Sequence, residues 1–167
     1  MGGGEGFLAQ HDERSGSRVE LEALDQVRLE LAELWEGLLE TLRAVCALGE
    51  LTPRARDRVL ATGEKLSVRL LTLAMRQAGL PAVALDADTF LETDGHFGEA
   101  SALPGVADRT IAAALRPRLE RGEIPVVTGF TGRAPDGATT TLGRGGSDLS
   151  ATILGAALEA DGVTIWT

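Results

Sequence analysis

Hydrophobic residues recur at helical spacing through the N-terminal part of the chain. Between Val19 and Leu48 they fall on one stripe with a seven-residue repeat, which predicts an amphipathic helix. The stripe consists of Leu24, Val27, Leu31, Leu34, Leu38, Val45 and Leu48. We expect it to pack against a sheet, with a coiled-coil pairing as the alternative. Residues 1–17 are rich in glycine and polar side chains, so we expect a flexible segment there.

Beyond Gly49 the pattern alternates between helices and short apolar runs. Thr52 followed by Pro53 is a strong helix start, because Thr caps well and Pro suits the first helical position. This helix should run toward Gly79, with a break near Gly63. Further helices are predicted at 106–121 and 149–158, and buried strands at 82–86, 124–128 and 162–166. Strands that alternate with helices are typical of a mainly parallel sheet covered on both faces, with ligands bound where the strands end.

Charge and hydropathy narrow the range of partners. The formal net charge is −9 and no run of lysine or arginine occurs, so we expect no nucleic-acid partner. No apolar run approaches the roughly 20 residues that a membrane span needs, and the N-terminus lacks the pattern of a signal sequence. We therefore expect no membrane partner and a cytoplasmic location.

The stretch 139–148, Thr-Thr-Thr-Leu-Gly-Arg-Gly-Gly-Ser-Asp, carries the strongest chemical signal. Its glycines let the backbone approach a ligand and adopt positive φ, and N–H groups before a helix can bind an anion. Arg144 adds a planar set of donors suited to a carboxylate, and Asp148 could hold an ammonium group. The alternative is a tight connection to the next helix, with Ser147 or Asp148 as an ordinary cap.

A second candidate is Glu64, which follows Gly63 within an otherwise apolar helical region. Its carboxylate could face a cleft. Taken alone, a surface glutamate near a helix break is the simpler interpretation.

Five segments resemble segments of aspartate kinases, in the amino acid kinase superfamily, and they follow one another along the chain in the family's order. The segment 141–148, Thr-Leu-Gly-Arg-Gly-Gly-Ser-Asp, is similar to the family signature, and 63–67, Gly-Glu-Lys-Leu-Ser, to its "GE-x-L-S" segment. The segments 85–87 and 93–100 resemble its middle loop, 124–132 its "P-V-x-x-G-F-x-G" strand and loop, and 165–167 the start of "W-T-D-V-D-G". The resemblance covers roughly residues 50 to 167.

The resemblance implies an α/β fold, a three-layer αβα sandwich with a mainly parallel sheet, here incomplete. Residues 18–167 would form part of the catalytic domain. The substrates would be L-aspartate and ATP, with Mg²⁺, and the whole enzyme would be a homo-oligomer. The resemblance assigns the aspartate pocket to Glu64, Phe130, Arg144, Ser147 and Asp148. It assigns the nucleotide site to Gly145, Gly146 and Thr167.

The chain departs from the family at its phosphate-binding lysine. The family's Lys-Phe-Gly-Gly-Thr-Ser segment has no counterpart before Val19, and Lys65 is the only lysine. We therefore identify no catalytic residue and expect little kinase activity from this polypeptide alone. The alternatives are a non-catalytic module that binds aspartate or serves assembly, and an amino acid kinase with another acceptor.

Overall fold

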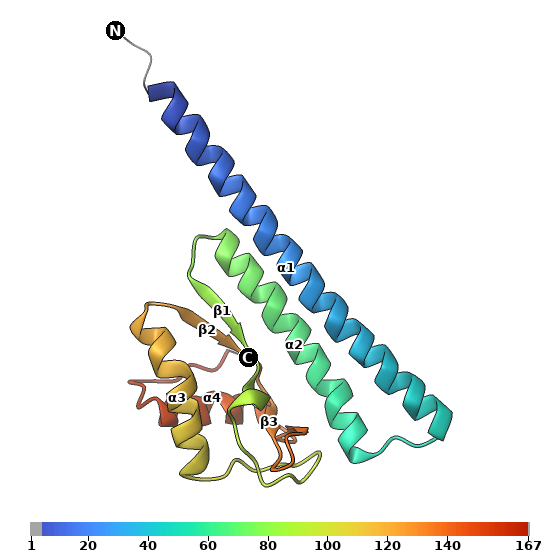
Figure 1. Cartoon of the computed structure of the whole chain (residues 1–167). Coiled ribbons are helices and arrows are strands. Elements are labelled where there is room, and N and C mark those ends of the chain that lie inside the picture. The colour runs from blue at the N-terminus through green and yellow to red at the C-terminus, as the bar shows by residue number, and fades with distance from the viewer. Residues whose placement is uncertain (1–4, 167) are drawn as a thin grey trace.

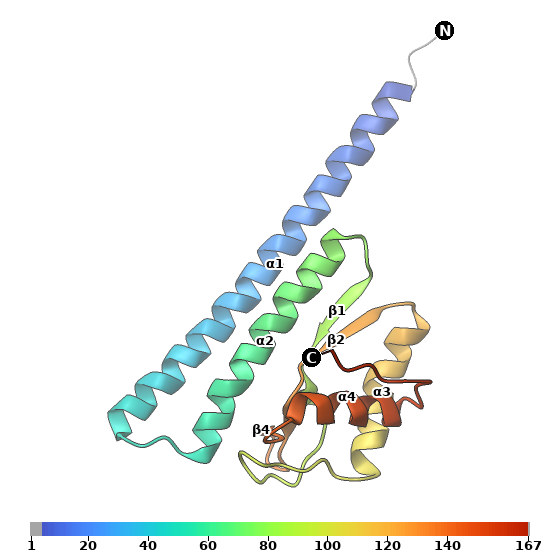
Figure 2. The ribbon, with the colours of Figure 1, turned by 180° about the vertical axis from the view of Figure 1, so that it is seen from behind.

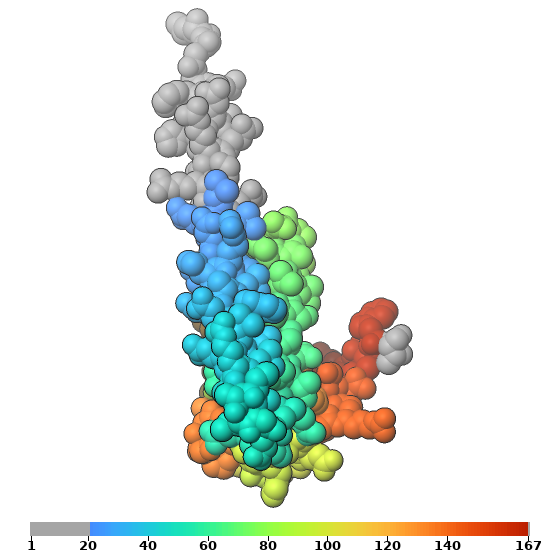
Figure 3. Space-filling view, turned by 90° about the vertical axis from the view of Figure 1, so that its right-hand side faces the viewer, coloured from blue at the N-terminus to red at the C-terminus, as the bar shows by residue number. Residues whose placement is uncertain are grey.

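The computed structural model describes the backbone of residues 5–166 and the side chains of residues 21–166. Two long helices, α1 and α2, lie side by side (Figures 1 and 3), and α2 covers one face of a short parallel sheet. Helices α3 and α4 contact each other on the other side of that sheet (Figure 2). The three-layer α/β fold with a parallel sheet is therefore confirmed.

Helix α1 spans Glu5–Leu48 and helix α2 spans Pro53–Gln77. The sequence placed the start of the first helix at Val19, which was too late. The polar residues before Val19 include good helix formers and no proline, so the helix extends through them. The break expected near Gly63 is also absent, because a single glycine is tolerated within a long helix. The Thr52 hydroxyl accepts from the Ala55 N–H at 3.2 Å, which confirms the predicted cap.

The parallel sheet joins β1, Ala82–Leu85, to β2, Ile124–Val127, with Ala82 opposite Ile124. Both strands agree with the sequence prediction. A hairpin of β3, Thr131–Arg133, and β4, Thr139–Thr141, lies in a stretch where no strand was predicted. The strand predicted at 162–166 was wrong: this exposed segment pairs with no strand within the described residues.

The core lies between the parallel sheet and helices α3, Val106–Glu120, and α4, Gly146–Ala157. Leu91, Ile111 and Leu115 are fully buried there, next to the short 3₁₀ helix η1, Ala87–Thr89. None of the described helices is long and apolar enough to cross a membrane.

Candidate functional site

The glycine-rich loop runs from the end of β4 to the start of α4. Gly143 and Gly145 both adopt left-handed backbone, with φ of 74° and 73°. A Cβ at Gly143 would lie 3.3 Å from the carbonyl oxygen of Gly98, so the loop packs closely on the segment around Gly98. Between these glycines Arg144 is exposed, and it makes no hydrogen bond or ion pair with any described residue. Its guanidinium is therefore available to an anionic ligand.

Phe130 lies against this loop in a strained conformation. Its φ is 65°, a value that residues other than glycine rarely adopt. Two hydrogen bonds hold it there: its N–H donates to the Ser150 hydroxyl at 2.7 Å, and its carbonyl accepts from the Leu142 N–H at 2.8 Å. The Ser150 hydroxyl in turn donates to the Gly146 carbonyl at 2.7 Å. Strain stabilised in this way is often found where a backbone is shaped for a ligand.

Helix α4 presents its N-terminal end beside Phe130. Gly145, rather than Ser147 or Asp148, is the N-cap, so the interpretation of either side chain as the cap was wrong. Both residues occupy the first turn, and their side chains are exposed. The Gly146 N–H donates to the Gly143 carbonyl at 3.1 Å and is not free for phosphate. The N–H groups of Ser147 and Asp148 have no acceptor within the described part of the chain, so they could bind an anion.

The structure brings two of the predicted site residues into contact and shows two others without partners. Phe130 and Ser147 meet at Gly129, where a Cβ would lie 3.4 Å from the Cβ of Ser147. Glu64 is half-buried on α2, and like Asp148 it makes no hydrogen bond or ion pair with a described residue. Thr167 lies outside the described residues. The ligand-binding roles of all these residues remain predictions.

Asp57 is a polar residue that the sequence analysis overlooked. Its side chain is fully buried, at 0% exposed, on helix α2. One carboxylate oxygen accepts from the Gly98 N–H at 2.7 Å and the Thr141 N–H at 2.9 Å, and the other accepts from the Thr141 hydroxyl at 2.9 Å. The surrounding sequence, Arg-Ala-Arg-Asp-Arg, reads as a solvated charged face, so only the buried positions Ala61 and Val68 on the same face could have indicated it.

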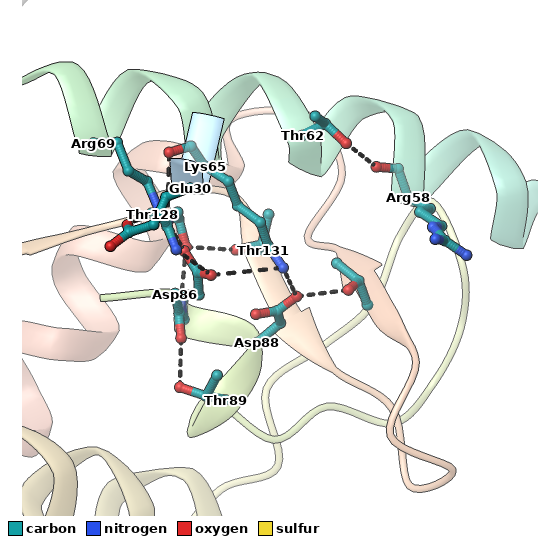
Figure 4. Close-up of polar contacts among 12 residues, drawn as sticks. Glu30, Arg58, Thr62, Lys65, Arg69, Asp86, Asp88, Thr89, Thr128 and Thr131 are labelled. Atoms are coloured by element: carbon teal, nitrogen blue, oxygen red, sulfur yellow. Dashed lines mark hydrogen bonds and ion pairs between the residues drawn. The ribbon is translucent and has the colours of Figure 1, made fainter. Parts of the chain in front are cut away.

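A second polar cluster joins both long helices to the strand ends (Figure 4). Lys65 forms an ion pair with Asp88 at 2.7 Å and lies 3.8 Å from Asp86. Arg69 binds Asp86 through two nitrogens and pairs with Glu30 of α1 at 3.5 Å. The hydrogen bond to Asp86 raises the pKa of Arg69 above its usual value. The cluster ties the helical layer to the sheet, and it occupies the only lysine of the chain.

Two neighbouring threonines lie among the residues of this cluster (Figure 4). The Thr128 hydroxyl accepts from the Ala87 N–H at 2.8 Å and lies 2.9 Å from the Thr131 hydroxyl. The Thr128 hydroxyl, at the end of β2, thus satisfies a backbone N–H just beyond the end of β1, at the edge where parallel sheets usually bind ligands.

No group of three or more histidine, cysteine, aspartate or glutamate side chains among the described residues is arranged to hold a metal ion.

Comparison with known proteins identifies the class to which this fold and this loop belong. The Amino acid kinase family matches residues 2–167, and the chain belongs to that family. Within it, the chain is similar to the aspartokinases. It is 39% identical over 115 residues to the aspartokinase of Thermus thermophilus, covering 68% of this chain and 27% of the relative. It is 36% identical over 143 residues to the lysine-sensitive aspartokinase 3 of Escherichia coli, covering 84% and 31%.

Solved structures agree with these relatives. The aspartokinase III of E. coli in complex with aspartate and ADP matches with a TM-score of 0.79 and 33% identity over 84% of this chain and 31% of that one. The same enzyme in complex with lysine and aspartate matches with a TM-score of 0.80 and 32% identity, over 86% and 32%. The chain thus spans about a quarter to a third of the length of these relatives.

Proposed function

We propose that this chain supplies the aspartate-binding part of an aspartate kinase, which phosphorylates the side-chain carboxylate of L-aspartate with ATP to give 4-phospho-L-aspartate. This reaction is the first step toward lysine, threonine and methionine. The observation that carries the proposal is Arg144 in the glycine-rich loop, with the carboxylates Glu64 and Asp148 on the flanking helices, since none of these three has a partner among residues 21–166. The aspartate and ADP bound by the E. coli relative support the same ligands here.

The proposed roles follow from the chemistry of an amino acid. Aspartate presents an α-carboxylate and an α-ammonium, so its binder needs a cation and at least one anion. Arg144 would hold the α-carboxylate through two parallel hydrogen bonds. Glu64 and Asp148 would hold the ammonium, while Ser147 and the backbone at Phe130 line the pocket. The side-chain carboxylate is then left to face the nucleotide.

Phosphoryl transfer to a carboxylate depends mainly on alignment and on neutralising the phosphate oxygens. We propose that Gly145, Gly146 and Thr167 border the nucleotide, and that Mg²⁺ arrives with ATP. The Gly146 N–H already donates to the Gly143 carbonyl. Gly146 would therefore let the nucleotide come close to the backbone without donating a hydrogen bond to it. Lys65 is held by Asp88 and is poorly placed to reach phosphate. We therefore propose that these residues alone bind aspartate but turn over little ATP.

Calorimetric titration of the chain with L-aspartate tests the proposal. Replacing Arg144 by Ala removes a charge-assisted pair worth about 1.5–3 kcal/mol, so the affinity should fall roughly 10- to 150-fold. Arg144→Lys keeps the charge without the planar fork and should give an intermediate loss. Arg28→Ala, on the outer helix and 81% exposed, is the matched control and should bind as the wild type does. Unchanged affinity in Arg144→Ala would show that the site is assigned wrongly.

Two further measurements separate the alternatives. Trapping acyl phosphate with hydroxylamine in the presence of ATP and Mg²⁺ distinguishes a kinase from a module that only binds aspartate. Titration with L-glutamate tests for another acceptor, since a longer side chain should bind more weakly in a pocket built for aspartate. The cytoplasmic location and the homo-oligomeric whole enzyme also remain proposals, for which fractionation and light scattering are the tests.

A further inference from the structure

The buried carboxylate of Asp57 connects three separate segments of the chain. It belongs to α2, and its partners are the Gly98 N–H, in the loop before α3, and the N–H and hydroxyl of Thr141 at the end of β4. Thr141 also accepts, through its carbonyl, from the Ala100 N–H at 2.9 Å. Three donors on one fully buried carboxylate are enough to hold the three segments at a fixed spacing.

The segments that Asp57 connects also carry residues of the proposed aspartate pocket. On α2, Asp57 and Glu64 are seven residues apart, so they project from nearly the same face, about 10 Å apart along the helix axis. On the other side, Thr141 is followed by Leu142, Gly143 and Arg144. The Gly143 backbone packs against Gly98, the other residue bound by Asp57.

We propose that Asp57 is a positioning residue that fixes the distance between Glu64 and Arg144, and thereby sets the pocket to the length of a bound amino acid. The inference rests on the proposed aspartate site, but it adds a residue that touches no substrate. A carboxylate suits this task because one of its oxygens accepts from both N–H groups while the other accepts from the hydroxyl. An apolar residue of similar size would leave two buried N–H groups without acceptors.

Asparagine provides a sharp test of this geometry. Its carbonyl oxygen can take the place of the oxygen that accepts from Gly98 and Thr141, and its NH₂ can donate to the Thr141 hydroxyl, which also accepts. Asp57→Asn thus keeps three hydrogen bonds, with the direction of the one to the Thr141 hydroxyl reversed, and loses the charge. Asp57→Ala loses all of them.

The experiment compares the full chain with Asp57→Asn, Asp57→Ala and the exposed control Asp25→Ala, by calorimetric titration with L-aspartate and by amide hydrogen exchange. We expect Asp57→Ala to bind at least 10-fold more weakly and its Gly98, Thr141 and Gly146 amides, each hydrogen-bonded in the wild type, to exchange at least 10-fold faster. Asp57→Asn and Asp25→Ala should remain within about 3-fold of the wild type in both measurements. If Asp57→Ala does not fold, Thr141→Val, which removes one of the three donors, should show a smaller loss of the same kind.

The outcomes distinguish this inference from the proposed function. Weak binding by Asp57→Asn equal to that of Asp57→Ala would overturn the positioning role and assign the effect to charge. Wild-type binding and exchange in a folded Asp57→Ala would overturn it as well. If the wild type fails to bind aspartate, the proposed function falls, and the exchange of the Gly146 amide in Asp57→Ala alone decides whether the carboxylate holds the loop.

Discussion

Replacing Gly132 by Ala adds one methyl group at a position where the fold has no room for it. Gly132 is buried in the middle of β3, opposite Thr140. A Cβ there would lie 2.5 Å from the Thr93 methyl, 3.0 Å from a Leu91 methyl and 3.0 Å from the Leu91 carbonyl oxygen. Carbon atoms in good contact are about 3.5–4.0 Å apart, so the neighbours would have to move by roughly 1 Å.

The neighbours cannot move easily. Leu91 is fully buried and Thr93 is 1% exposed. The Thr93 hydroxyl lies 2.9 Å from the Thr140 hydroxyl and donates to the Arg133 carbonyl at 3.1 Å, so rotating its methyl away breaks both contacts. Overpacking of a filled interior costs about 1–3 kcal/mol, and we expect the upper end here. In a domain of this size, 3 kcal/mol lowers the melting temperature by roughly 6–12 °C.

Urea unfolding followed by circular dichroism measures this loss, and Gly63→Ala serves as the matched control. A Cβ at Gly63 meets no atom within 4 Å, and the residue lies in the middle of α2. The same methyl should therefore raise the free energy of unfolding, by about 0.5–1 kcal/mol, because alanine restricts the unfolded chain and favours the helix. If Gly132→Ala were neutral, or if both substitutions shifted stability in the same direction, the packing argument would fail.

Three further changes probe the site and its supports. Ser150→Ala leaves the strained Phe130 N–H without its acceptor, so we expect about 1–3 kcal/mol of lost stability in thermal unfolding and weaker aspartate binding in calorimetry. Lys65→Met leaves the Asp88 carboxylate, whose side chain is 8% exposed, without its cation, and should cost about 3 kcal/mol; adding Asp88→Leu should recover much of this in a double-mutant cycle. The N–H and imidazole of His96 lower the pKa of Asp94, so that carboxylate stabilises the fold above its unfolded pKa, and the contribution is lost as pH falls through the lower folded value; acid unfolding of Asp94→Ala should therefore be less steep than that of the wild type.

The helices and buried strands could be predicted because their signals are local. The Thr52-Pro53 start and the apolar runs of β1 and β2 each indicate one structure without reference to the rest of the chain. The β3–β4 hairpin gave no such signal, since most of its buried residues are threonines, which bond to polar groups of other segments, rather than an apolar alternation. The segment 162–166 has an apolar pattern, but a strand also needs a partner, and periodicity alone cannot supply one.

The residues of the candidate site also differ in how far the sequence alone reveals them. Arg144 stands out because a cation placed among three glycines, just before a predicted helix, is visible in the sequence itself. Asp57 does not stand out, because its structural role depends on the N–H groups of Gly98 and Thr141, which are brought close to it only in the folded chain. Strain at Phe130 is likewise invisible in the sequence, because nothing in a phenylalanine indicates a positive φ.

The contacts of Asp57 also order the events of folding. Its partners lie 41 and 84 residues further along the chain, so α2 can be synthesised and form a helix before either partner has been synthesised. Until then the carboxylate stays hydrated, because burying it without hydrogen-bond donors would cost free energy. Helix α2 therefore docks fully only once Thr141 is in place, so the ligand pocket should be among the last parts of the molecule to assemble.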